Sequence, residues 1–283
     1  MVVSSNDDLA RTLARDIVAT FGPGWSGLDE TLAGDGCAER VQRFMATSEP
    51  LEHLYKRARV GGVRLSGFKQ PDYAYVGLQA PDGAPPFDAL FDALFAPRLA
   101  GGRGREPGFR RIFEALARLA PSRPLIVETG CLRLPGNWGG DGQSTFMWDA
   151  FARSVGGDVF SIDVSIESID TARRACSGYT NLIHNDSVFA LSTLSSLLEG
   201  RQIHCLYLDS FDLDPNDPMP SAIHHAQELA AARPLLKRGS IVCIDDYRIG
   251  DAVGGKGAIV DPFMRSVDAA VLQDGYAKVW QLR

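Results

Sequence analysis

PLIVETG, residues 124–130, is an apolar run that ends in an acidic residue and a glycine. A run of this length is typical of a strand buried on both faces of a sheet. Similar runs follow along the chain, with amphipathic stretches between them. We expect strands at 124–130, 158–165, 180–187, 203–210, 240–247 and 275–283, and helices at 109–120, 145–155, 165–178, 188–200, 221–239 and 261–271. Strands that alternate with helices predict an α/β fold, in which a parallel sheet is covered on both faces.

The chain changes character near residue 107. Residues 1–107 hold few strand signals and many Gly and Pro turns, with helical patterns at about 7–20, 37–46 and 87–97. We expect this mainly helical N-terminal region to complete a pocket, form a lid or mediate homodimerisation, and 108–283 to be the ligand-binding domain. Phe87, Phe91 and Phe95 recur at helical spacing, so we expect them in the core.

The composition excludes several classes of protein. The formal net charge of −6 disfavours broad binding to nucleic acid or to an anionic membrane. No apolar run is long enough to span a bilayer, and the N-terminal residues do not resemble a signal peptide. The five cysteines form no CxxC pair, which disfavours a disulfide framework or a zinc ribbon. We therefore expect a cytoplasmic protein.

A glycine-rich loop follows the first expected strand. VETGCLRLPGNWGGDGQST runs from residue 127 to residue 145, with Glu128 and Gly130 at the strand end. Glycines let the backbone approach a ligand closely, and the helix that follows offers free N–H groups. The spacing is not GxGxxG, which disfavours a nicotinamide cofactor. The alternative is an ordinary strand-to-helix loop, although this one is long for that role.

Asp163 ends the second expected strand. An acid at this place commonly accepts hydrogen bonds from the two hydroxyls of a ribose. The alternative is a carboxylate that only supports the helix beginning near Ser165. Together with the glycine-rich loop one strand earlier, Asp163 favours a cofactor that carries a nucleoside.

Three further acids follow two later strands. Asp209 ends the strand at 203–210, and Asp245 and Asp246 end the strand at 240–247. If these strands are neighbours, the three carboxylates converge and repel one another. A divalent cation relieves that repulsion, and oxygen ligands favour Mg²⁺, Ca²⁺ or Mn²⁺. The alternative is that the acids cap helices or face solvent.

Residues 109–283 resemble class I S-adenosylmethionine-dependent methyltransferases. The likeness implies a Rossmann-like, doubly wound, mostly parallel seven-stranded sheet. VETGC and its loop are similar to the motif that holds the methionine part of the cofactor, SIDVS to the ribose-binding acid, and HNDS to the segment that meets the adenine. The implied cofactor residues are Glu128, Gly130, Cys131, Gly142, Ser144, Asp163, Asp186, Ser187 and Asp209.

YLDS and IDDY are similar to the metal motifs of Mg²⁺-dependent O-methyltransferases, most of all the macrocin-type enzymes that methylate sugars of natural products. That likeness implies Asp209, Asp245 and Asp246 as magnesium ligands. The sequence departs from the catechol-type enzymes at Asp212, where those carry a lysine.

Methyl transfer to a hydroxyl needs a group that takes up the proton. Asp212 lies three residues beyond Asp209, and His224 lies in the first turn of the helix expected from residue 221. His224, Asp212 and Asp209 are therefore the candidate catalytic residues. A second glycine-rich stretch, 250–261, is expected either to cover the acceptor, with Lys256 on an anionic group, or to be a plain loop.

The motifs predict an S-adenosylmethionine-dependent O-methyltransferase. The expected acceptor is a hydroxyl of a small metabolite, a sugar or a natural-product scaffold, chelated by a divalent metal. One alternative is a metal-independent N- or O-methyltransferase of small molecules. The other is a non-catalytic protein that keeps the fold.

Overall fold

The computed structural model describes residues 69–283 except 102, 199 and 251. Pro71–Arg283 forms one compact unit. The helices expected at about 7–20 and 37–46 lie outside the described residues. No helix among those described is both long and apolar enough to cross a lipid bilayer.

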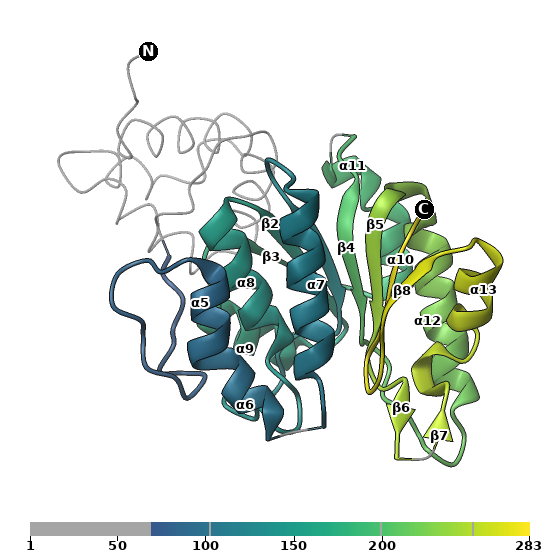
Figure 1. Ribbon diagram of the computed structural model, residues 1–283, viewed down its shortest axis with the longest axis horizontal. Coiled ribbons are helices and arrows are strands. Elements are labelled where there is room, and N and C mark those ends of the chain that lie inside the picture. Colours follow the sequence, from purple (N-terminus) through teal and green to yellow (C-terminus); the bar gives the residue numbers. More distant parts are fainter. Residues whose placement is uncertain (1–68, 102, 199, 251) are drawn as a thin grey trace, which may run out of the picture. The chain divides into compact units, whose positions relative to one another are not determined.

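A seven-stranded sheet forms the centre of this unit (Figure 1). Its strands lie in the order β3-β2-β1-β4-β5-β9-β8, so the chain winds outward from β1 in both directions. The pairs among β1 to β5 are parallel, and β9 is antiparallel to β5 and to β8. The expected doubly wound, mostly parallel sheet is confirmed. Its strands are β1 (Leu125–Thr129), β2 (Asp158–Asp163), β3 (Thr180–His184), β4 (Ile203–Leu208), β5 (Leu236–Ile244), β8 (Ala270–Asp274) and β9 (Lys278–Gln281).

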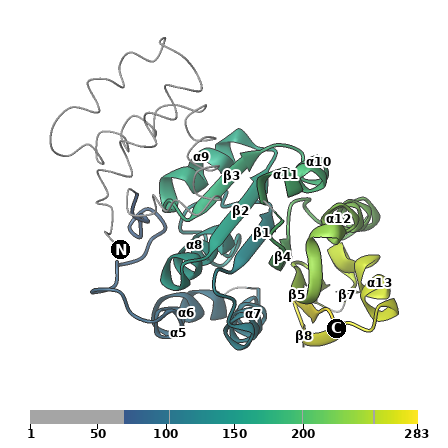
Figure 2. The ribbon, with the colours of Figure 1, turned by 90° about the horizontal axis from the view of Figure 1, so that it is seen from above.

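Helices cover both faces of the sheet (Figures 1 and 2). One face carries α7 (Glu106–Leu119), α8 (Ser144–Val155) and α9 (Ile166–Ala175). The other carries α10 (Ser187–Thr193), α12 (Met219–Ala232) and α13 (Val260–Ser266). The single turn α11 (Ser195–Leu198) precedes β4, and a small hairpin of β6 (Arg248–Ile249) and β7 (Ala252–Val253) follows β5. Most side chains of the central strands are buried and apolar, as the uninterrupted runs predicted; Glu128 and Ser161 are buried polar exceptions.

Two of the expected helices end several residues earlier than the sequence interpretation placed them. The helix expected to run to residue 239 ends at Ala232, because Pro234 cannot continue an α-helix, and β5 begins at Leu236. The helix expected to run to residue 271 ends at Ser266, and Asp268 adopts a left-handed backbone with φ 52°. The residues after it form β8, the edge strand that the sequence interpretation missed.

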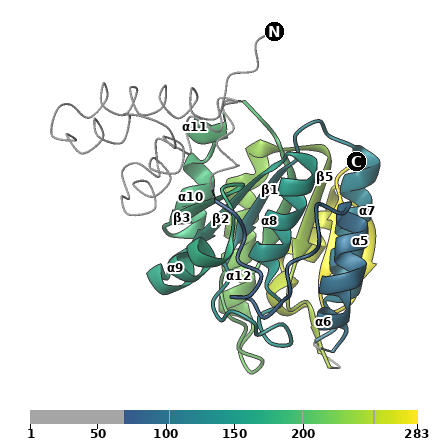
Figure 3. The same ribbon diagram turned by 90° about the vertical axis from the view of Figure 1, so that its left-hand side faces the viewer.

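The segment before α7 packs on the same core. The helical turns α5 (Phe87–Leu90), η2 (Phe91–Phe95) and α6 (Ala96–Ala100) lie beside α7 and α8 (Figure 3). The Phe87 ring lies 4.4 Å from that of Phe113 on α7, and the Phe95 ring stacks at 5.8 Å on Trp138. The expectation that these phenylalanines belong to the core is confirmed. Residues 71–107, which the sequence interpretation grouped with the N-terminal region, thus belong to the compact unit.

Candidate active site

Gly130 joins three strand ends at the carboxyl edge of the sheet. Its backbone N–H donates to the carbonyl of Ile162 at 2.8 Å, and its φ is +79°. A Cβ at this position would lie 2.5 Å from the carbonyl oxygen of Asp209. Only glycine fits a left-handed position with so little room. The turn after β1 is therefore held directly against the first residue of the acidic cluster described below.

Hydrogen bonds to Asp163 connect the loop after β1 to the end of β2. One carboxylate oxygen accepts the N–H of Cys131 at 2.8 Å, and the other accepts the N–H of Ser165 at 2.8 Å. Ser165 itself caps α9 by accepting the N–H of Ser168. Two carboxylate oxygens offer about four acceptor positions. Asp163 thus supports the local turn, as the alternative interpretation held, and keeps capacity for ligand hydroxyls.

Glu128 points into the interior rather than toward the carboxyl edge. Its carboxylate accepts hydrogen bonds from Thr145 at 2.7 Å, Ser161 at 2.6 Å and Trp148 at 3.1 Å. Burial raises the pKa of Glu128 to about 7, against the effect of these hydrogen bonds and of one from Ser144. Glu128 is fully enclosed and Ser144 bonds to it, so both side chains have partners within the protein; their contact with a cofactor stays a prediction.

The glycine-rich loop is held by hydrogen bonds within the loop and packs against Arg105. Gln143 donates to the carbonyl of Leu134 at 2.8 Å and accepts the N–H of Gly136 at 3.0 Å. A Cβ on Gly142 would lie 2.8 Å from Cδ of Arg105. Gly142, expected to contact the cofactor, therefore makes room for a side chain of the protein.

Asp186 and Ser187 begin α10 at the end of β3. Asp186 caps the helix, because its carboxylate accepts the N–H of Phe189 at 2.9 Å. The Ser187 hydroxyl lies 3.0 Å from Nε2 of His224. This turn is tied to the end of β2, since the N–H of Asn185 donates to the carbonyl of Asp163 at 3.0 Å. The segments expected to meet ribose and adenine are thus neighbours.

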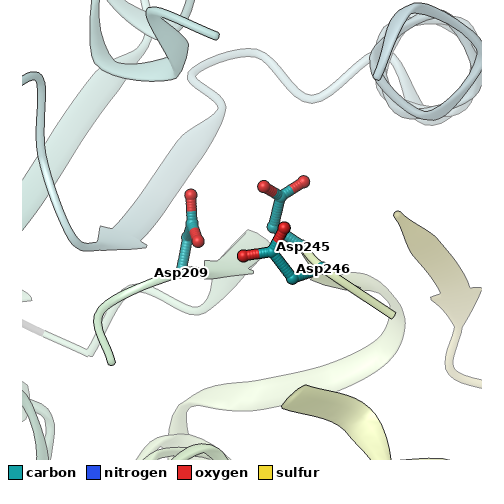
Figure 4. Close-up of side chains that lie close together, drawn as sticks. All are labelled: Asp209, Asp245 and Asp246. Atoms are coloured by element: carbon teal, nitrogen blue, oxygen red, sulfur yellow. The ribbon is translucent and has the colours of Figure 1, made fainter. Parts of the chain in front are cut away.

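Asp209, Asp245 and Asp246 form an acidic cluster (Figure 4). Each contributes an oxygen, and these oxygens lie within 4.8 Å of one another. The cluster forms because β4 and β5 are parallel neighbours, with Leu208 opposite Ile244, so both strands end at the same level. Asp245 and Asp246 are buried, and Asp209 is half-buried. The convergence expected from the strand ends is confirmed.

Two buried cations of the chain lie in the acidic cluster, and a third, the exposed Arg103, lies 4.0 Å from Asp246. Arg105, which directly precedes α7, contacts Asp245 through Nε at 2.9 Å and Nη2 at 2.7 Å. The Lys256 ammonium contacts Asp209 directly and lies 3.2 Å from Asp246. Arg105 is 5% exposed and Lys256 is 1% exposed. Both positive charges are therefore enclosed together with the carboxylates.

The pKa values in the cluster reflect burial and these neighbours. Burial raises the pKa of Asp209 to about 8; Lys256 opposes this rise, and the two neighbouring carboxylates add to it. Burial also acts to raise the pKa of Asp246, but Lys256 and a hydrogen bond from Tyr276 lower it below its ordinary value. Despite burial, the carboxylates raise the pKa of Lys256, which stays an ammonium at neutral pH.

The ligand atoms of the cluster would suit a metal ion, whereas the charges around them oppose one. Three carboxylates are ligands that Mg²⁺ accepts. The lysine ammonium, however, lies against two of them, and the arginine holds the third. A divalent ion added to this arrangement would meet two buried positive charges. In this arrangement the residues therefore do not fit a metal ion.

The two proposed bases outside the cluster have other partners. Asp212 has a side chain that is 75% exposed and binds Arg133 at 3.0 Å. His224 lies between Ser187 and the buried Glu228, with 3.4 Å from Nε2 to the Glu228 carboxylate. Its pKa is raised, chiefly by the hydrogen bond with Glu228. Among the three candidates, only Asp209 belongs to the acidic cluster.

Sequence reasoning missed Arg105 and Tyr276. The Tyr276 hydroxyl donates to Asp246, and its ring lies 4.9 Å from the Arg105 guanidinium. Arg105 sits in a glycine-rich turn with nothing nearby to mark it as buried. Lys256 was expected to meet an anionic group, and here that group belongs to the protein itself. The glycines that flank Lys256 were the available signal.

No family model matches this chain, and no curated protein matches its sequence. Solved structures with a similar backbone include the MycE methyltransferase from the mycinamycin biosynthetic pathway in complex with Mg and SAH, at 12% identity and a TM-score of 0.48, covering 71% of this chain and 55% of that one. Another is CalS11, a TDP-rhamnose 3'-O-methyltransferase of calicheamicin biosynthesis, at 15% identity and a TM-score of 0.43, covering 83% of this chain and 95% of that one.

The O-methyltransferase NovP is also similar, at 14% identity and a TM-score of 0.41, covering 63% of this chain and 80% of that one. The chain spans about half the length of MycE. At such identities the likeness concerns the arrangement of the backbone alone. The function of this chain therefore has to be argued from its own residues.

Proposed function

We propose that this chain is an S-adenosylmethionine-dependent O-methyltransferase whose acceptor is a hydroxyl of a small metabolite, such as a sugar or a natural-product scaffold. The observation that carries the proposal is the close approach of Gly130 to Asp209. It joins the turn after β1, where a nucleoside-bearing cofactor would lie, to the acidic cluster, where an acceptor would be deprotonated. Parallel sheets of this kind bind ligands at their carboxyl edge.

The cofactor would lie along the ends of β1, β2 and β3. The free acceptor positions of Asp163 suit the ribose hydroxyls. Val164 and Phe189 are apolar side chains that are 73% and 58% exposed, and they flank Asp163 and Asp186 in segments that are bonded to each other. Exposed apolar groups beside acids suit a purine ring, with Ser187 as a polar contact. When bound, S-adenosylmethionine supplies a methyl group activated by its positively charged sulfur.

The acceptor would meet the acidic cluster. Its hydroxyl must lose a proton, and Asp209 is the candidate that lies in the cluster and next to the turn after β1. Because its pKa is raised to about 8, Asp209 would act as a base chiefly above that pH, where it is ionised. The enclosed Lys256 ammonium contacts Asp209 and Asp246 and would hold these carboxylates in place beside the acceptor.

The magnesium ion expected from the sequence is not part of this proposal, because the acidic cluster already holds Lys256 and Arg105. No step of the reaction is therefore assigned to a metal.

Isothermal titration of the full chain with S-adenosylmethionine and S-adenosylhomocysteine tests the proposal. Asp163→Ala should weaken binding about 10- to 100-fold, since a hydrogen bond to a charged group contributes about 1.5–3 kcal/mol. Asp170→Ala is the matched control, because Asp170 is an exposed acid on α9 whose partner is Arg173. Absence of binding by the unaltered chain at millimolar ligand would reject the proposal.

A further inference from the structure

Lys256 is an unusual residue to find at an acidic site. A lysine is rarely fully buried unless its charge is paired. Here the side chain is 1% exposed, and its ammonium contacts the carboxylates that follow two different strands, Asp209 after β4 and Asp246 after β5. It therefore lies between two of the three carboxylates that the sequence pattern predicts as metal ligands.

Most of the negative charge of the cluster is compensated without a metal. Lys256 faces Asp209 and Asp246, and Arg105 faces Asp245 through two nitrogens. The Tyr276 hydroxyl donates to the other oxygen of Asp246. With all three carboxylates ionised, the two buried cations leave one negative charge, and the exposed Arg103 lies 4.0 Å from Asp246. A divalent ion would reverse the sign of a buried site that has little solvent to screen it.

The backbone around Lys256 is built for this placement. The lysine lies in the turn η4 (Gly255–Gly257), which packs against α12. Gly255 has a φ of +43°, and a Cβ there would collide with the carbonyl oxygen of Asp246. The N–H of Lys256 lies 3.4 Å from that same carbonyl. The close approach of this turn to Asp246 places the lysine side chain in the cluster, so its burial follows from the main chain.

We propose that Lys256 is the resident cation of the acidic cluster and takes the place of a divalent metal, so that the chain acts without one. The ammonium holds Asp209 and Asp246 together, and the half-buried Asp209 is the carboxylate of the cluster that a hydroxyl-bearing acceptor can reach. The part of this inference that concerns the acceptor rests on the proposed function. The part that concerns the cation does not.

Binding of Mn²⁺ to the full chain, followed by electron paramagnetic resonance of the free ion, tests the inference without any methyl transfer. The unaltered chain should show no saturable binding at millimolar Mn²⁺. Lys256→Met removes the ammonium but keeps most of the side-chain volume. This variant should bind one Mn²⁺ per chain at least about 100-fold more tightly, because a positive charge has left a buried acidic site. Adding Asp246→Asn to this variant should abolish that binding.

Lys278→Met is the matched control. Lys278 is also buried between two carboxylates, with Asp261 at 2.8 Å and Asp274 at 3.1 Å, but it lies outside the acidic cluster. Its loss should destabilise the chain without creating a tight Mn²⁺ site. Mn²⁺ should also raise the Tm of Lys256→Met and leave that of the unaltered chain unchanged, since a ligand that binds only the folded state stabilises it.

Saturable binding of Mn²⁺ to the unaltered chain that is lost in Asp246→Asn would overturn the inference. This comparison of the unaltered chain with Asp246→Asn needs no lysine variant. It therefore tests whether the cluster binds a metal even if Lys256→Met fails to fold. Failure of the proposed function would look different: the chain would not bind S-adenosylmethionine, whereas its response to Mn²⁺ would still follow the prediction.

Discussion

Arg105 and Asp245 form a buried ion pair that joins the start of α7 to the end of β5. Two guanidinium nitrogens reach the same carboxylate oxygen, at 2.9 and 2.7 Å, and the Asp245 side chain is fully buried. A third nitrogen of Arg105 donates to the carbonyl of Gly140 at 2.7 Å. The pair therefore connects the acidic cluster to the glycine-rich loop and to the helix before β1.

Arg105→Met should lower the free energy of unfolding by about 3–5 kcal/mol, because it leaves the Asp245 carboxylate buried beside two other acids without its partner. Urea unfolding followed by circular dichroism measures this. Arg111→Met is the control, since Arg111 pairs with Glu114 on the exposed side of α7 and should cost less than about 1 kcal/mol. A double variant with Asp245→Asn should recover part of the loss. If the two losses simply add, the pair is not coupled as described.

The ends of the strands could be predicted from the sequence because they depend on local pattern. Asp163, Asp209 and Asp245 each follow an apolar run, and parallel neighbours end at a common edge. The meeting of the three cluster acids followed from that alone. Strand β8 was missed because AVLQD is short, lies at the edge of the sheet and has only partly buried side chains, so its apolar period is weak.

The cations of the cluster could not be predicted in the same way. Arg105 and Asp245 are 140 residues apart, and their contact depends on how α7 lies against the sheet. Lys256 reaches Asp209 only because its turn packs against the backbone of Asp246. Without these contacts the three acids appear uncompensated, which is why the sequence pointed to a metal ion.

Glu128 gives the chain a pH-dependent stability. Its pKa is about 7 in the folded chain against 4.5 for an unperturbed carboxyl, so the folded state holds the proton more tightly. Its contribution to the free energy of unfolding is therefore greatest below about pH 4.5 and falls as the pH rises toward 7. Above pH 7 this contribution no longer changes. Glu128→Gln should remove this dependence. The difference in unfolding free energy between the two proteins should change by roughly 3 kcal/mol over that range.

Denaturant melts of the unaltered chain and Glu128→Gln at a series of pH values check this. Taking the difference between the two proteins cancels the contributions of His204 and His225, whose pKa values burial lowers from 6.5 to about 4 and which therefore change stability over an overlapping pH range. A difference that stays flat from pH 4.5 to pH 7 would show that the buried carboxyl titrates normally.

Gly130→Ala should be far more damaging than an equivalent change elsewhere, because the added Cβ meets the backbone of Asp209 rather than a flexible side chain. Gly200 has nearly the same backbone, with a φ of +80°, and nothing lies within 4 Å of its Cβ position. Gly200→Ala should therefore cost only the backbone strain, about 1–2 kcal/mol. Gly130→Ala should cost about 1–3 kcal/mol more from overpacking. Equal losses in urea unfolding would contradict the contact.

We expect Asp209, but not Asp212, to remove the proton from the acceptor hydroxyl. Asp209 lies in the acidic cluster beside the turn of Gly130, whereas Asp212 is exposed and paired with Arg133. With the first acceptor identified from a panel of sugars and natural-product scaffolds, Asp209→Asn should lower kcat at least about 100-fold. Asp212→Asn should change it by less than about 3-fold, since an exposed ion pair contributes little.

The pH dependence of kcat in these variants shows whether Asp209 takes up the proton or only supports the structure. If Asp209 takes the proton, the rate of the unaltered chain should fall below about pH 8, where Asp209 is protonated, and the small residual rate of Asp209→Asn should lose that limb. Asp212→Asn and His224→Gln should keep the same limb at nearly the same pH. If instead the limb disappears in His224→Gln, the proton goes to the histidine that lies 3.0 Å from Ser187, and the acceptor must approach from the side of α10 rather than from the acidic cluster.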